Sequence, residues 1–168
     1  SAIVTVRHDT QTDSGEALIA SDLAFAPDNF QPGEISPLLA SLTQATGTAK
    51  FNGRIAWTAH DQTSGGTLDV GDADFNGPLG AVKQAQTRIV FTSLAPLATA
   101  SAQALAAQKI EWLVPFAGLL LKFQLTEEAI RIESFAASAA GGHVSLGAMT
   151  VALDPKSTTS GTLVLDNV

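Results

Sequence analysis

The stretch from Ala49 to Ala59 reads AKFNGRIAWTA, and its apolar and polar residues alternate. In an extended chain, Phe51, Ile55 and Trp57 fall on one face, whereas Lys50 and the other polar residues fall on the opposite face. A period of two is the signature of a β-strand with one buried and one solvated face. The stretch therefore predicts an amphipathic strand.

The same alternation recurs along the chain. Further strands are predicted at residues 3–7, 16–20, 23–25, 67–71, 86–91, 118–125, 129–135, 143–153 and 162–165. Turn signals separate them, in the order TSGG, NGPLG, TEE, SAAGG and DPKSTTSG. The spacing of about ten residues predicts a mainly β fold, a β-meander forming one extended or rolled antiparallel sheet, such as a β-groove or half-barrel.

One or two short helices are expected beside this sheet. Ser36 suits an N-cap, Pro37 suits the first helical position and Gly47 can end the element, so a helix is predicted from Ser36 to Thr46. The alanine-rich run of residues 94–108 favours a helix by composition. Its Ser, Thr and Pro residues oppose that, and helix and strand both stay open.

Length and composition limit the classes of protein. A chain of 168 residues is the size of one domain, so residues 1–168 are interpreted as a single β-rich domain, and its start without Met and its strand-like last residues suggest a piece of a longer protein. The formal net charge of −7 repels phosphate backbones, which argues against a nucleic-acid partner. The chain contains 0 Cys, which excludes disulfides and thiolate metal sites.

The segment DADFNG resembles the first half of a calcium loop. Asp72, Asp74, Asn76 and Gly77 match its early positions, but Lys83 stands where a bidentate glutamate is required. We therefore interpret the segment as a turn with both aspartates in solvent, and we expect no metal site and no cofactor.

Catalytic constellations are weak. His60, Asp61 and Ser64 lie together in a polar turn, and Ser145 lies inside a predicted strand rather than on a nucleophile elbow. The histidines His8, His60 and His143 are widely spaced and fit no zinc pattern. The paired acids Glu127 and Glu128 are interpreted as a charged turn. A diffuse glycosidase site that uses Asp69 or Glu133 is the last candidate. We therefore expect that the chain is not an enzyme.

The remaining signal is apolar. The candidate binding face consists of Phe51, Ile55, Trp57, Leu119, Leu121, Phe123, Leu125, Ile130, Ile132, Val144 and Leu146. Most such faces pack on another layer and form a core. Few helices are predicted to cover this one, which favours an open groove for acyl chains. Both interpretations stay open.

The order of elements resembles a known family. From Gly47 onward, the run TSLAPL after a strand, the hairpin GGHVSLG and the turn at Asp154 and Pro155 are similar to the C-terminal region of YdbH-type proteins, AsmA-like envelope proteins whose domain was formerly labelled dicarboxylate transport. The similarity covers roughly the last 120 residues.

This resemblance implies a periplasmic protein of Gram-negative bacteria, anchored at its N-terminus in the inner membrane, whose rolled sheets carry phospholipids between membranes. It implies phospholipid acyl chains as partners, and other envelope proteins through the rest of the parent chain. Our first hypothesis is therefore a lipid-handling module with the apolar face as its trough. The alternative is a structural or adhesion-type β-sandwich without lipid cargo.

Overall fold

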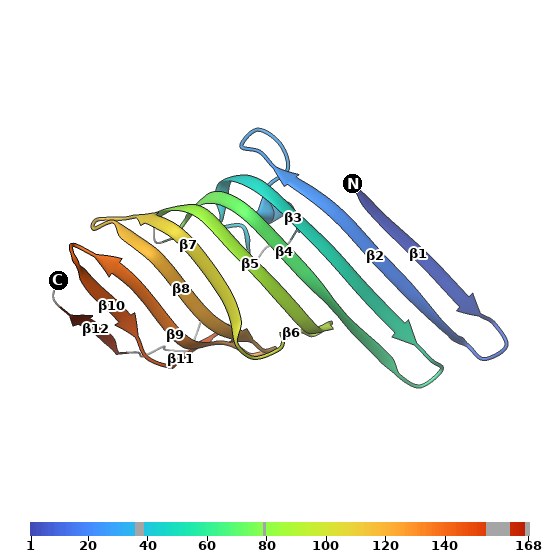
Figure 1. The fold of residues 1–168 in the computed structure, drawn as a ribbon. Coiled ribbons are helices and arrows are strands. Elements are labelled where there is room, and N and C mark those ends of the chain that lie inside the picture. The colour runs from blue at the N-terminus through green and yellow to red at the C-terminus, as the bar shows by residue number, and fades with distance from the viewer. Residues whose placement is uncertain (36–38, 79, 154–161, 167–168) are drawn as a thin grey trace.

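In the computed structural model, residues 1–35, 39–78, 80–153 and 162–166 are described, and their strands form one 12-stranded antiparallel sheet (Figure 1). The elements are β1 (Ala2–Asp9), β2 (Ser14–Phe25), α1 (Pro32–Ile35), β3 (Thr43–Trp57), β4 (Gln62–Gly77), β5 (Gly80–Leu94), β6 (Leu97–Thr99), β7 (Gln103–Glu111), β8 (Phe116–Leu125), β9 (Ala129–Ala139), β10 (Gly142–Leu146), β11 (Met149–Ala152) and β12 (Leu163–Asp166).

The strands follow one another across the sheet in chain order, as a meander does. The path is β1-β2-β3-β4-β5-β7-β8-β9-β10-β12, while β6 pairs with β5 and β11 pairs with β9. Each of these two short strands shares a pairing partner with a longer strand. β6 pairs with the end of β5 that β7 does not reach, and β10 and β11 pair with successive parts of β9. This confirms the predicted extended antiparallel sheet.

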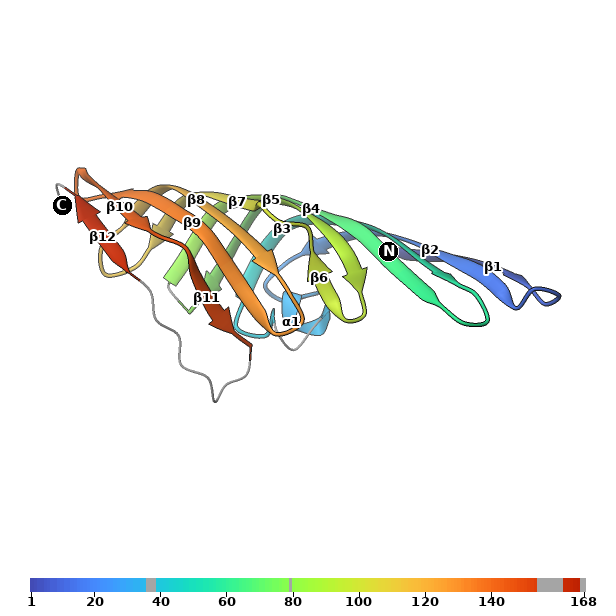
Figure 2. The same cartoon turned by 90° about the horizontal axis from the view of Figure 1, so that it is seen from below.

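The described strands form a single layer. Seen from the edge, the strands lie in one curved sheet, and α1 lies beneath it next to β3 (Figure 2). Among the described residues no large side chain is fully buried, which is the expected result where no second layer covers a sheet. The alternative of a β-sandwich is therefore wrong for the described residues.

The helix predicted from Ser36 to Thr46 is wrong in its position. The helical residues are Pro32–Ile35, and Thr43 to Thr46 already belong to β3. Residues 36–38, which carry the predicted N-cap, lie outside the described residues. Gln31 explains part of the difference: its side-chain Oε1 accepts from the Ala45 amide at 2.8 Å, and its Nε2 donates to the Ala45 carbonyl at 3.1 Å, which ties this segment to the first residues of β3.

Two other stretches settle differently from their local signals. The alanine-rich run forms β6 and β7, because pairing with β5 and β8 overrides the helical preference of alanine. The predicted TSGG turn lies inside β4, and the chain reverses earlier, at residues 58–61, where the Thr58 amide donates to the Asp61 carbonyl at 2.8 Å. The DPKSTTSG turn falls outside the described residues.

The central strands bend where their ladder is interrupted. Register shifts lie between Val70 and Phe75 of β4, opposite β5, and between Ala117 and Leu120 of β8, opposite β9. Asp72, Gln84 and Gly118 have positive φ at these shifts, and Gly47 has positive φ at a further shift between Thr46 and Thr48 of β3, opposite β4. Such β-bulges increase the local twist and curve the strand.

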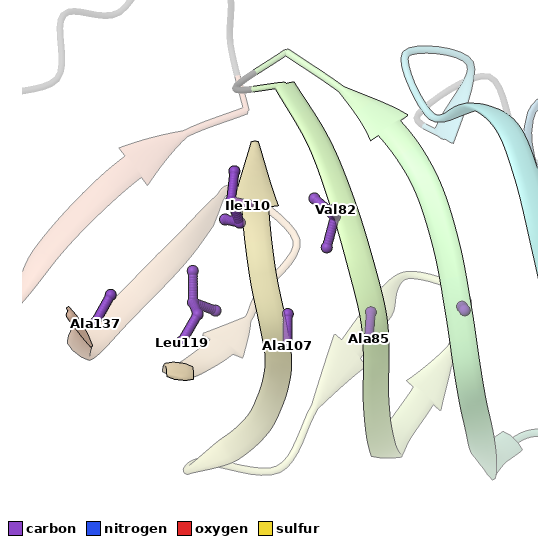
Figure 3. Close-up of a cluster of buried hydrophobic side chains, with 7 residues drawn as sticks. Val82, Ala85, Ala107, Ile110, Leu119 and Ala137 are labelled. Carbon is purple, nitrogen blue, oxygen red and sulfur yellow. The ribbon is translucent and has the colours of Figure 1, made fainter. Parts of the chain in front are cut away.

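The most buried residues gather on the inside of this bend. They are Ala73, Val82, Ala85, Ala107, Ile110, Leu119 and Ala137, contributed by β4, β5, β7, β8 and β9 (Figure 3). Most of them are alanines, whose small side chains let neighbouring strands curl towards one another without overlap. The cluster therefore marks the concave side of the sheet.

Candidate functional site: the apolar inner face

All the residues predicted for the apolar binding face share one face of the sheet. The pairing register places Phe51 with Leu68, Leu121 with Leu105 and Phe135, and Val144 with Ala137, and side chains of directly paired residues point to the same side. We call this side, which carries the buried alanine cluster, the inner face.

The structure thereby joins two groups of residues that lie far apart in the sequence. Phe51, Ile55 and Trp57 come from β3, whereas the other predicted residues come from β8, β9 and β10. Leu119 and Val144 are 6% and 4% exposed, and the other predicted members are partly exposed to solvent. The face is thus continuous across the sheet and accessible over most of its area.

The sequence analysis missed the middle of this face. The additional large members on β4, β5, β7, β8 and β9 are Leu68, Val70, Phe75, Val82, Ile89, Phe91, Leu105, Ile110, Phe116 and Phe135. The alternation of residues 86–91 was a usable signal for Ile89 and Phe91. The predicted strand 67–71 likewise contains Leu68 and Val70. Register shifts interrupt the alternation further along β4 and β5 and between β8 and β9, so the other positions needed the pairing register.

Aromatic rings are distributed along the whole face. Phe51 and Phe91 meet edge to face with centroids 6.3 Å apart, and His8 stacks on Trp57 at 6.1 Å. At the other strand ends, Phe25 stacks on Phe30 at 5.8 Å, which folds the connection that contains α1 back towards the inner face.

The few polar groups on the inner face are occupied by backbone. The Gln103 side-chain oxygen accepts from the Val90 amide at 2.6 Å, and Ser64 Oγ accepts from the Leu94 amide at 3.0 Å. The Leu125 amide donates to Thr99 Oγ1 at 2.9 Å. In the described part of the chain no buried side-chain N or O lacks a partner, so this face offers an apolar surface rather than free donors.

The opposite, outer face carries the charges. Arg54 Nε lies 3.0 Å from Glu16 Oε2, and Arg88 lies 3.4 Å from Asp69. Lys50 lies 3.8 Å from Asp22. These pairs are solvent-exposed and contribute little to stability, but they make the sheet amphipathic.

The calcium-like segment has a structural role. Asp72 to Gly77 belong to β4, and the chain turns after Gly77. Asp74 Oδ2 lies 3.1 Å from Lys83 Nζ, and its Oδ1 accepts from the Gln84 amide at 2.8 Å. The hydrogen bond from the Gln84 amide and, to a smaller extent, the bond from Lys83 hold the pKa of Asp74 below its ordinary value. The expectation that Asp74 stays in solvent is wrong.

The polar side chains considered for catalysis lie apart or have structural partners. His8, His60 and His143 belong to β1, the β3–β4 turn and β10. Glu133 accepts from the Ala102 amide at 2.9 Å, and Asp69 pairs with Arg88. Ser145 and Glu127 are exposed, on β10 and in the β8–β9 turn. Within the described ranges no three potential metal ligands cluster.

In the part of the chain that the structure describes, no helix has the length and hydropathy needed to cross a bilayer.

Comparison with known proteins assigns the family. The model of the YdbH-like family, described as intermembrane phospholipid transport protein YdbH, matches residues 2–168. No curated protein and no solved structure matches the chain. The match covers nearly the whole chain and therefore extends to β1 and β2, beyond the resemblance noted from Gly47 onward. The chain belongs to the YdbH-like family of intermembrane phospholipid transport proteins.

Proposed function

We propose that the inner face holds the acyl chains of phospholipids, and that the chain is one β-rich segment of a longer, inner-membrane-anchored envelope protein that carries them across the periplasm. The single observation behind this proposal is the continuous apolar face of a one-layer sheet, from Trp57 in β3 to Val144 in β10. The family supplies the cargo, since its described role is phospholipid transport between membranes.

Burial of hydrocarbon supplies the affinity in this mechanism. Removing apolar surface from water contributes roughly 25 cal/mol per Å², with no requirement for direction. The polar groups beside the face are already bonded to backbone, so they do not compete for headgroups. Acyl chains can therefore slide along the face at nearly constant free energy, and selectivity for the headgroup is loose.

Native mass spectrometry of the bacterially expressed chain tests the proposal. We expect phospholipid to co-purify with the wild-type chain and to be lost in Leu121→Asp, because that charge would lie on the inner face. Leu120→Asp is the matched control: it changes the neighbouring residue of β8, whose side chain points to the outer face, and it should keep the lipid.

A second variant separates loss of binding from loss of folding. Leu121→Trp keeps the face apolar but fills space on it, so we expect a lower lipid load with an unchanged circular dichroism spectrum. Absence of lipid from the wild-type chain, with no uptake of a dansyl-labelled fatty acid, would refute the proposal. Equal loss in L120D and L121D would also refute it.

A further inference from the structure

The β7–β8 turn exposes a cluster of apolar side chains. Trp112, Leu113 and Val114 are 53%, 88% and 43% exposed, and Pro115 completes the turn. Leu113 is the most exposed of the large hydrophobic residues that the structure describes. A protein in water gains nothing from such a tip, which therefore indicates a contact with an apolar partner.

The surroundings of the turn are electrically neutral. Residues 112–115 carry no ionisable side chain, and the charges next to them cancel, because Lys109 Nζ lies 2.7 Å from Glu111 Oε1. The β1–β2, β3–β4 and β8–β9 turns differ: they carry Asp13, Asp61, and Glu127 with Glu128. The connection that contains α1 carries Asp28 and Glu34.

The turn is also continuous with the inner face. The Trp112 ring stacks on Phe116, with centroids 6.5 Å apart and planes 24° from parallel. Phe116 in turn packs against the buried cluster that contains Ile110 and Leu119. An unbroken apolar path therefore runs from the exposed tip to the concave side of the sheet.

We propose that residues 112–115 dock the chain on a lipid bilayer, with Trp112 and Leu113 seated at the level of the headgroups and upper acyl chains. A bilayer accepts a short apolar tip without a complementary shape, whereas a specific protein interface buries about 800 Å² on each partner. Trp prefers the membrane interface. Pro115 has no amide proton, so the turn brings one donor fewer into a medium that cannot accept it.

This inference rests on the proposed function, because docking would place the apolar path along Trp112 and Phe116 next to the bilayer that supplies the phospholipid. The absence of net charge at the tip predicts that docking needs no anionic lipid and that salt leaves it unchanged.

The chain contains 2 Trp, so Trp57→Phe leaves Trp112 as the only Trp reporter of the turn. With vesicles of phosphatidylcholine, we expect a blue shift of Trp112 emission and quenching by brominated phosphatidylcholine, at low and high salt alike. In the same background, Leu113→Asp should weaken vesicle binding at least about tenfold, because a charge replaces the most exposed apolar contact. Ile3→Asp, at an exposed position of β1 that is 67% accessible, should bind as before.

A second readout separates the two proposals. L113D should still take up a dansyl-labelled fatty acid from solution, since that residue lies outside the inner face. Unchanged Trp112 emission in the presence of vesicles would overturn the bilayer proposal and leave a protein as the occupant of the tip. Equal vesicle binding by L113D and the parent would overturn it too. Neither result bears on fatty-acid uptake by the inner face.

Discussion

At the scale of single residues, Asp74 shows how a bent strand keeps its polar groups satisfied. The bulge in β5 leaves the Gln84 amide without a partner across the ladder, and the Asp74 carboxylate accepts from it at 2.8 Å. The second oxygen pairs with Lys83 at 3.1 Å. The residue that looks like a calcium ligand in the sequence is thus a side-chain replacement for a backbone acceptor.

Replacing Asp74 by Ala should lower the free energy of unfolding by about 1 kcal/mol at neutral pH. The value is modest because the side chain is 33% exposed. The pKa of Asp74 is lowered in the folded protein, so its stabilisation is present above the ordinary pKa of 3.8 and is lost as the pH falls through the lower folded value. Urea unfolding of both chains at neutral and acidic pH should show the difference shrinking in acid.

The control for this prediction is Asp69→Ala. Asp69 lies on the same strand and face, but it pairs with the exposed Arg88 side chain at 3.4 Å. Its loss should cost less than about 0.5 kcal/mol. An equal loss of unfolding free energy in D69A and D74A would show that the hydrogen bond from the Gln84 amide to Asp74 adds no stability beyond that of an exposed ion pair.

At the scale of elements, the sequence predicts strands well and their interruptions poorly. The alternation in residues 49–59 and 118–125 locates β3 and β8, because one apolar and one solvated face impose a period of two. The run of residues 94–108 has no such pattern, and only pairing with β5 and β8 decides its conformation. The bulge at Asp72 and the start of α1 at Pro32 depend on contacts between residues that are distant in sequence. Local propensity does not predict such contacts.

Two glycines with positive φ allow a test of the close approach between β5 and β7. A Cβ at Gly80 (φ 105°) would overlap the carbonyl oxygen of Glu111, whereas one at Gly141 (φ 87°) would meet nothing within 4 Å. Gly141→Ala should therefore cost about 1 kcal/mol, from backbone strain alone. Gly80→Ala should cost about 3 kcal/mol, because β5 and β7 must also separate locally.

Chemical denaturation of the two variants measures this difference. Amide hydrogen exchange should locate the additional loss in G80A at the paired ends of β5 and β7, near Ala81 and Glu111. Equal destabilisation by the two substitutions would contradict the close approach of Gly80 to β7.

At the scale of the whole molecule, a one-layer sheet leaves much of its apolar surface for a ligand to cover. The candidate face could be predicted in part, since Phe51 and Leu121 follow simple alternation. Its continuity could not, because it depends on β4, β5 and β7 joining the two groups in register. A rolled sheet was predicted, but the place where it bends depends on the bulges, which the alternation does not locate.

Ligand binding to the inner face should raise the thermal midpoint. At a free fatty-acid concentration of 100 times Kd, binding contributes about 2.7 kcal/mol. For a chain of 168 residues this corresponds to a shift of roughly 5–10 °C. Differential scanning fluorimetry with a soluble medium-chain fatty acid measures the shift, and L121W should show a smaller one. A midpoint that stays constant over the whole concentration range would exclude binding to the folded sheet.

Under the proposed function, the alanines inside the bend would set the space that the inner face offers to acyl chains. Ala73, Ala85, Ala107 and Ala137 determine how closely β4, β5, β7 and β9 approach on the concave side. Exchanging one of them for valine would force the arc to open, and exchange for glycine would let it tighten, with strand number and charge unchanged. Homologues adapted to bulkier or slimmer hydrocarbon could thus differ at these four positions while keeping the remaining sheet intact.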